Sequence, residues 1–128
     1  MRGTVGRPRI AVVDDDAAVR AALERLLISM RFRTQTYASA EEFLTDGQAA
    51  TFACVLLDVQ LRGMSGIELT IYLAARHPEL AIVLLTANPE VVARNAFASR
   101  MASSVLRKPV DADVLISAVE NAVAVAAT

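Results

Sequence analysis

The chain has 128 residues, of which 55% are hydrophobic and 21% are charged, and its formal net charge is −1. This length suits one domain with one buried core. No apolar run approaches the roughly 20 residues that a membrane-spanning helix needs, and the basic residues form no cluster beyond the amino-terminal segment, so neither membrane insertion nor nucleic-acid binding is expected. The one cysteine, Cys54, excludes an internal disulfide framework and suits a reducing, cytoplasmic location.

Four short apolar runs and one weaker, partly alternating segment at residues 33–37 predict five strands after a flexible leader at residues 1–8. They fall within a single predicted domain at residues 9–125. The strands are expected at residues 9–13, 33–37, 53–57, 81–85 and 104–106. The first, third and fourth runs are nearly continuous, which is typical of strands buried on both faces of a sheet.

Helical periodicity and capping residues predict five helices between and after these strands. Ser39 and Glu42 fit a capping box, and Asn88 followed by Pro89 is a typical helix start. The helices are expected from Asp16 to about Met30, from Ser39 to about Gly47, from the Gly63–Gly66 loop to about His77, from Asn88 to about Ser99, and from Asp111 to about Ala124.

This alternation of strands and helices predicts a three-layer, doubly wound α/β fold with a parallel sheet. In such folds the ligand site lies outside the carboxyl ends of the strands. Polar side chains follow or end four of the predicted strands, and we expect them to meet at one edge of the sheet. They are Asp14 and Asp15, Asp58, Thr86 and Lys108.

These residue types predict a site for a cation and a phosphoryl group. Carboxylates held close together repel each other unless a cation compensates, and oxygen ligands without a His or Cys cluster favour Mg²⁺. Lys108 can pair with a phosphate oxygen, and Thr86 can donate a hydrogen bond to it. Asp58 is the better candidate for a nucleophile toward phosphorus because it stands alone in the sequence, which leaves the Asp14–Asp15 pair free to hold the metal.

Four segments of the chain resemble the receiver domains of two-component response regulators. The resemblance spans residues 9 to about 124 and implies a flavodoxin-like sheet with strand order 2-1-3-4-5. It also implies a protein that accepts a phosphoryl group from a sensor histidine kinase or a phosphotransfer protein, relays a conformational change, and catalyses only its own phosphorylation and dephosphorylation. The segments are Val12–Asp16, Leu57–Gly66, Leu85–Ala87 and Arg107–Pro109.

The resemblance assigns a role to each acidic residue of the site. Asp58 corresponds to the phosphorylated aspartate. Asp15 and Asp58 would ligate Mg²⁺ directly, together with the backbone carbonyl of Gln60. Asp14 would act largely through bound water, and Asp16 is expected to cap the following helix instead of joining the site.

The resemblance also assigns the residues that would contact the phosphoryl group. Thr86 would move toward it and Lys108 would pair with one of its oxygens. The Lys108–Pro109 peptide bond would be cis, a geometry tolerated chiefly before proline, and would aim the lysine into the site.

Three residues depart from the family's pattern. Val105 stands where receivers usually carry an aromatic residue that turns inward on activation. Met101 replaces a common glycine in the turn before the last strand, where a Cβ disfavours a left-handed conformation. Arg62 replaces a common proline after the phospho-acceptor. We therefore expect unusual signalling through the surface of the fourth helix, fifth strand and fifth helix, with phosphorylation chemistry intact.

Three other functions fit the sequence less well. A haloacid-dehalogenase-type enzyme would need an aspartate where Gln60 stands, and a nucleotide- or flavin-binding module would need a Gly-, Ser- or Thr-rich loop after the first strand. A degenerate receiver that signals only by protein contact would usually lose one of the site residues. The chain is expected to be either a stand-alone receiver or the amino-terminal regulatory piece of a longer DNA-binding regulator, with an unknown downstream partner and homodimer formation left open.

Overall fold

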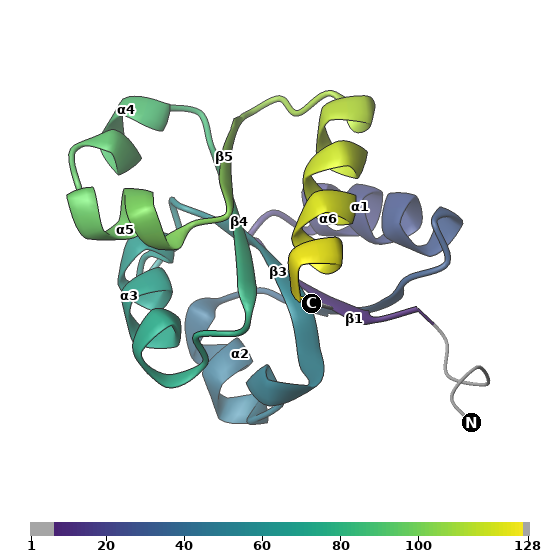
Figure 1. Ribbon diagram of the computed structural model, residues 1–128. Helices are drawn as coiled ribbons and strands as arrows, with labels where there is room; N and C mark the ends of the chain where they lie inside the picture. The colour runs from purple at the N-terminus through teal and green to yellow at the C-terminus, as the bar shows by residue number, and fades with distance from the viewer. Residues whose placement is uncertain (1–6, 127–128) are drawn as a thin grey trace.

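The computed structural model describes residues 7–126. Five parallel strands form one sheet in the order β2-β1-β3-β4-β5 (Figure 1). The predicted fold class and strand order are therefore confirmed. The strands are β1 (Arg9–Val13), β2 (Arg33–Tyr37), β3 (Phe52–Asp58), β4 (Ala81–Thr86) and β5 (Ser104–Arg107).

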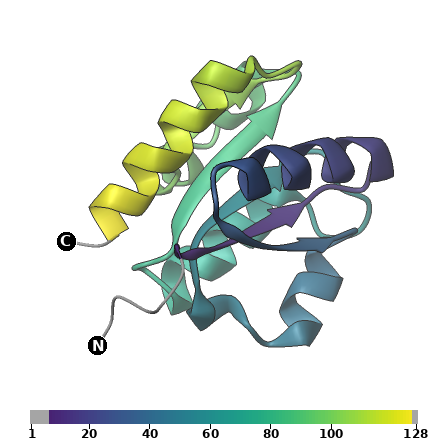
Figure 2. The ribbon, with the colours of Figure 1, turned by 90° about the vertical axis from the view of Figure 1, so that its right-hand side faces the viewer.

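Helices cover both faces of the sheet. The helices are α1 (Ala17–Ser29), α2 (Ala40–Asp46), α3 (Gly66–Arg76), α4 (Pro89–Ala93), α5 (Ala96–Met101) and α6 (Ala112–Ala126), and a 3₁₀ helix, η2 (Ala49–Thr51), precedes β3. Helices α1 and α6 lie on one face of the sheet, and α2 to α5 lie on the other (Figures 1 and 2). This is the predicted three-layer arrangement.

The central strands are buried on both faces, as their apolar sequences predict. In β3, Val55 and Leu57 belong to the core between the sheet and helices α2, α3 and α4. Cys54 and Leu56 belong to the opposite core, under α1 and α6. All four side chains are fully buried, and burial of a leucine or valine stabilises a fold by about 1.5–3 kcal/mol. Both cores therefore hold β3, and with it the residue at its carboxyl end, in place.

The predicted helix from Asn88 to Ser99 is wrong in one respect, because two short helices, α4 and α5, take its place. Asn95 interrupts the helix with an extended backbone (φ −105°, ψ 97°), and its side chain accepts a hydrogen bond from Ala98 N–H at 2.9 Å. Asn95 thus caps a new helix. Asn88 precedes Pro89 at the predicted start, but its side chain makes no capping hydrogen bond.

The capping box predicted at Ser39 and Glu42 is only half formed. Ser39 Oγ accepts from Glu42 N–H at 3.0 Å, but the Glu42 carboxylate accepts from Ala38 N–H instead of from the amide of Ser39. A complete capping box occurs before α3, where Ser65 and Glu68 each accept from the other's backbone amide. This box fixes the start of the helix that follows the loop after Asp58.

Arg7 is the first residue that the structure describes, and its side chain packs against the domain. Positions 1–6 of the predicted leader lie outside the described residues. Arg7 stacks over the Phe32 ring at 4.1 Å and forms an ion pair with Glu120 at 2.6 Å, so it contacts both the α1–β2 turn and α6.

Within residues 7–126, none of the helices combines the length and apolar character that a bilayer-spanning helix requires.

Candidate functional site

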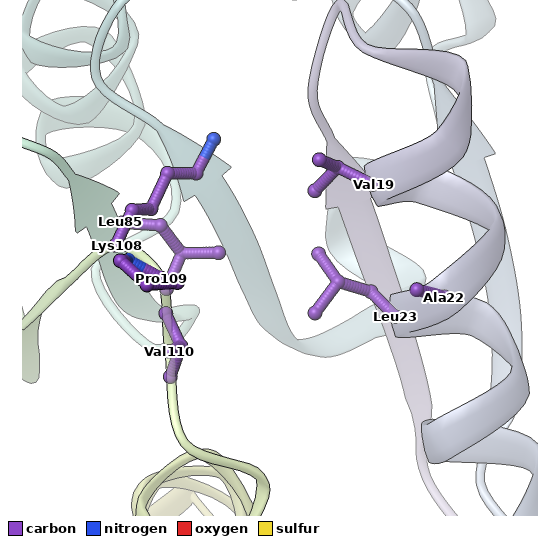
Figure 3. Close-up of a pocket in the computed structure, with 7 residues that line it drawn as sticks. All are labelled: Val19, Ala22, Leu23, Leu85, Lys108, Pro109 and Val110. Atoms are coloured by element: carbon purple, nitrogen blue, oxygen red, sulfur yellow. The ribbon is translucent and has the colours of Figure 1, made fainter.

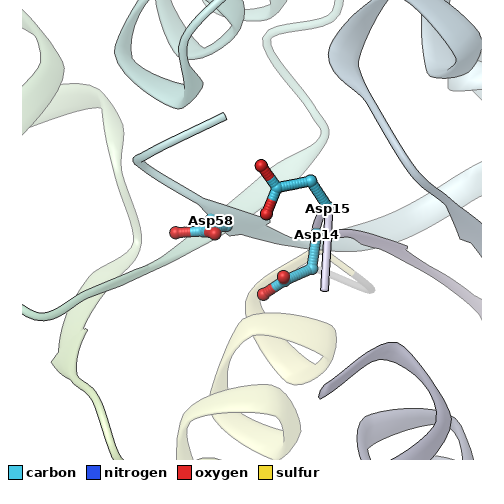
Figure 4. Close-up of side chains that lie close together, drawn as sticks. All are labelled: Asp14, Asp15 and Asp58. Carbon is cyan, nitrogen blue, oxygen red and sulfur yellow. The ribbon is translucent and has the colours of Figure 1, made fainter. Parts of the chain in front are cut away.

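The three predicted carboxylates meet at the carboxyl edge of the sheet. Asp14 follows β1 directly, Asp58 ends β3, and the two strands pair in a register that places Val13 beside Leu57. One oxygen from each of Asp14, Asp15 and Asp58 lies within 4.8 Å of the others (Figure 4). Asp14 and Asp58 are buried and Asp15 is exposed, so the cluster opens to solvent on the Asp15 side.

Lys108 joins the two buried carboxylates. Its Nζ lies 2.9 Å from Asp14 Oδ2 and 3.4 Å from Asp58 Oδ2. Burial alone would lower the pKa of Lys108, but the hydrogen bond to Asp14 and the charges of Asp14 and Asp58 together outweigh it and raise the pKa. Lys108 is therefore a charged partner in this site. The peptide bond between Lys108 and Pro109 is cis, as the resemblance to receiver domains implies.

The carboxyl of Asp58 is incompletely stabilised in its charged form. Burial is the main cause that raises its pKa, and the neighbouring Asp14 adds to this effect. The N–H of Gln60, which donates to Asp58 Oδ1 at 3.1 Å, and the ammonium of Lys108 oppose the rise but do not cancel it. Three carboxylates meet here, and Lys108 contacts two of them. A divalent cation with oxygen ligands fits this donor set.

Backbone contacts fix the turn that carries Asp14. The N–H of Asp16 donates to Asp14 Oδ1 at 2.9 Å, and Arg20 Nη1 donates to the Asp14 carbonyl at 2.7 Å. The Asp16 side chain accepts from the N–H groups of Ala18 and Val19 and so caps α1, as predicted. Asp14 is thereby oriented by its own loop and by α1.

Thr86 lies at the end of β4, with its side chain almost fully buried. Its hydroxyl oxygen accepts a hydrogen bond from Asn88 N–H at 3.0 Å, and its carbonyl oxygen accepts from Lys108 N–H at 2.8 Å. The backbone of Lys108 is thus tied to Thr86, while the lysine side chain reaches the carboxylates. The four predicted strand ends therefore converge at one edge.

The loop after Asp58 approaches the strand more closely than the sequence indicates. Gly66 N–H donates to the Val59 carbonyl at 2.9 Å, and a Cβ at position 66 would lie 2.2 Å from the Asp58 carbonyl oxygen. Only glycine fits here without moving the backbone of Asp58. In the sequence, Gly66 is recognisable only as a loop residue, and nothing in its neighbours indicates this contact.

Glu41 is a second residue that sequence analysis missed. Its Oε2 accepts from Met64 N–H at 2.8 Å, so α2 holds the loop that follows Asp58. This hydrogen bond is the main cause that lowers the pKa of Glu41. Gly63 adopts a left-handed backbone (φ 73°) beside the Glu41 carboxylate, and Arg62 before it is exposed. No local pattern indicates a contact between residues so distant in the sequence.

Two of the three residues that depart from the receiver pattern, Val105 and Met101, lie around β5, whereas Arg62 lies in the loop after Asp58. Val105 is partly buried and packs against the core between the sheet and helices α2 to α4. Met101 ends α5 with its side chain 38% exposed, and Ala102 after it is extended (φ −71°). Among residues 7–126, Arg31 is the only non-glycine residue with a positive φ, so the turn before β5 contains no left-handed residue.

An apolar groove adjoins the charged site. It has a volume of about 510 Å³ and lies between α1 and the loop after β5 (Figure 3). Val19 and Leu23 face it from α1, and Pro109 and Val110 face it from the other side. Lys108 also lines the groove, so the charged site and the groove share one residue. A protein that reaches Asp58 over this edge would meet an apolar surface.

Residues 10–120 match the family model of the response regulator receiver domain. The chain belongs to this family. The matched range covers β2 to β5, all but the first residue of β1, and part of α6. The receiver domain therefore accounts for nearly all of the described chain, and the prediction of a receiver domain is confirmed.

Two curated proteins and one solved structure illustrate the similarity. Transcriptional regulatory protein TdiR of Thauera aromatica is 35% identical over 90% of this chain and 51% of its own length. DNA-binding transcriptional regulator NtrC of Salmonella typhimurium is 32% identical over 88% of this chain and 24% of its own length. The response regulator TrrA from Thermotoga maritima, solved in complex with Mg²⁺-BeF, gives a TM-score of 0.81 at 28% identity, over 90% of this chain and 98% of the TrrA chain. This receiver domain thus spans about half or less of the two curated relatives.

We predict that Gly66→Ala destabilises the receiver domain by about 3 kcal/mol, because the new Cβ would meet the backbone of Asp58. Gly47→Ala is the matched control. Gly47 has a positive φ of 66° but open space around it, so the loss there should be about 1 kcal/mol. Urea unfolding of both variants measures the difference, and equal losses would contradict the close-approach argument.

We predict that Asp58→Asn raises the free energy of unfolding at neutral pH, without added metal, by on the order of 1 kcal/mol. The pKa of Asp58 is raised by burial in the folded state, so its ionisation costs stability as the pH rises through that pKa. Below the pKa of the unfolded carboxyl, the group is protonated in both states and the gain should vanish. Unfolding curves at about pH 3 and about pH 8 test this, and an equal gain at both would exclude the proposed cause.

Proposed function

We propose that Asp58 accepts a phosphoryl group from the phosphohistidine of a sensor histidine kinase or a phosphotransfer protein. A carboxylate oxygen of Asp58 would attack phosphorus, the P–N bond would break, and the leaving histidine nitrogen would take up a proton. The observation that carries this proposal is the position of Lys108 between Asp14 and Asp58. An ammonium already beside the nucleophile can stabilise the negative charge of a transferred phosphoryl group.

The carboxylate cluster supports Mg²⁺ as the cofactor. We propose that Asp14, Asp15 and Asp58 hold it together with the backbone carbonyl of Gln60. The fit rests on three carboxylates that share one small region, with Lys108 beside only two of them. When bound, Mg²⁺ would offset negative charge on the phosphoryl oxygens.

After transfer, the resident side chains would respond to a new dianion. Lys108 would pair with a phosphoryl oxygen in place of the Asp58 carboxylate, and the Thr86 hydroxyl would donate a hydrogen bond to another. Both changes alter contacts at the ends of β4 and β5. We propose that they bias a two-state equilibrium of the receiver domain, and that the protein catalyses no reaction besides its own phosphorylation and dephosphorylation.

The signal would leave through the surface that α4, α5, β5 and α6 form. Val105, Met101 and Pro109 lie on or near β5, while Arg62 lies on the loop after Asp58. Phe97 and Met101 are 40% and 38% exposed on α5, which supports a protein contact there, with an output domain or a second copy. We propose that the receiver domain is the amino-terminal regulatory piece of a longer cytoplasmic regulator, since TdiR and NtrC are longer and are named as transcriptional regulators.

Incubation with a small-molecule phosphodonor and Mg²⁺ should add the mass of one phosphoryl group to the intact protein. Asp58→Asn should abolish the adduct because the nucleophile is lost. Asp16→Asn is the matched control, since Asp16 caps α1 and an asparagine can do the same, so the adduct should persist. An adduct that survives in Asp58→Asn would rule out the assignment.

Mg²⁺ should raise the stability of the unphosphorylated receiver domain, by about 1.4 kcal/mol at ten times its dissociation constant. The ion binds the folded carboxylate cluster, and an excess of EDTA should remove the gain. Asp15→Asn should strongly reduce the effect because it deletes a predicted ligand. Asp113→Asn, which changes an exposed acid on α6, should leave it intact. Urea unfolding with and without Mg²⁺ measures each case, and a full gain in Asp15→Asn would contradict the metal site.

A further inference from the structure

The β4–α4 loop is held by hydrogen bonds at three successive residues. The Thr86 carbonyl accepts from Lys108 N–H at 2.8 Å. The Ala87 carbonyl accepts from Arg107 Nη1 at 3.3 Å. The N–H of Asn88 donates to the Thr86 hydroxyl oxygen at 3.0 Å. The conformation of this loop therefore depends on the end of β5 as well as on Thr86 itself.

Two of these bonds act on a single peptide group. The Ala87 carbonyl and the Asn88 N–H belong to the same planar peptide unit. Arg107 binds the oxygen of that unit and the Thr86 hydroxyl binds its N–H. Rotation of the peptide would break both bonds, and hydrogen bonds on both ends of one peptide strengthen each other. The bond to Arg107 and the bond to Thr86 are therefore coupled.

The strand register places Arg107 where it can make this contact. Arg107 pairs with Thr86 across the β4–β5 ladder. It lies two residues after Val105, so its side chain leaves β5 on the face that α4 and α5 cover. Val105 has no polar atom on its side chain, whereas Arg107 carries a permanent charge and several donors. In the structure, Arg107 is the side chain of β5 that contacts the β4–α4 loop by a hydrogen bond.

We propose that Arg107 is a positioning residue that sets how readily the Thr86 hydroxyl leaves Asn88 to bind an anion on Asp58. This inference rests on the proposed phosphorylation of Asp58. In the resting protein, Arg107 stabilises the peptide orientation in which Asn88 is bonded to Thr86. When Thr86 donates to a phosphoryl oxygen and turns away, Asn88 loses its partner and the peptide can rotate away from Arg107. Arg107 thus favours the resting state of a two-state loop.

The direction in which one substitution changes the affinity for beryllofluoride tests this role. Arg107→Ala should bind beryllofluoride, in the presence of Mg²⁺, about three- to tenfold more tightly than the unchanged protein, because the resting state loses one hydrogen bond. Loss of a positive charge near an anion site would by itself weaken binding. Arg100→Ala, which removes a charge from an exposed position in the last turn of α5, is the control and should bind no more tightly.

The coupling to Thr86 is tested by a double-mutant cycle. In a Thr86→Ala background, Arg107→Ala should change the beryllofluoride affinity by less than about twofold, since the hydroxyl it acts on is gone. In the single variant without ligand, the Asn88 amide resonance should shift toward its position in the beryllofluoride complex. Arg107→Met, which keeps an apolar stem and removes the donors, should behave like Arg107→Ala.

The outcomes separate the two proposals. If the unchanged protein binds no beryllofluoride and accepts no phosphoryl group, the proposed function fails. If the unchanged protein binds it while Arg107→Ala binds equally well or more weakly, the role of Arg107 is overturned. A gain of the same size in the Thr86→Ala background overturns it as well. Fluorine NMR of bound beryllofluoride gives the affinities directly.

Discussion

The ammonium of Lys108 contacts two buried carboxylates, Asp14 and Asp58, that would otherwise repel each other at the adjacent ends of the paired strands β1 and β3. Three strands must end at the same edge for this contact to form, so it depends on the strand order of the sheet. The compensation is partial, because burial and Asp14 still raise the pKa of Asp58. The resting site holds three carboxylates beside one lysine, a donor set that favours a divalent cation, and any change on Asp58 would alter its contacts with Lys108.

The strands and the site residues could be predicted because their signals are local. A buried parallel strand needs an apolar run, and Asp14, Asp58, Thr86 and Lys108 each stand where such a run ends. In doubly wound α/β folds, ligands bind outside the carboxyl ends of the strands, and this rule places the four residues together. The break between α4 and α5 was missed because Asn95 lies inside an otherwise helical pattern, and its capping bond to Ala98 is evident only once the backbone is known.

Contacts between residues far apart in the sequence were beyond prediction for a different reason. Glu41 and Met64 are joined by a side-chain bond to a backbone amide, and neither residue type signals such a partner. The contact of Gly66 with the Asp58 backbone likewise depends on how closely α3 approaches β3. Both contacts hold the loop after Asp58, so the acid itself was predictable from the sequence while the supports of its loop were not.

Helix α6 has a mechanical consequence for any segment that follows it. It begins shortly after Pro109, at the edge of the sheet that carries Asp58, and it runs to the opposite edge (Figure 1). Its 15 residues make a rod about 22 Å long. Leu115, Val119 and Ala122 bind this rod to the sheet along one face. A small tilt at its first turn would become a larger displacement at its last, so α6 could act as a lever that carries a change at the Lys108–Pro109 end across the whole domain.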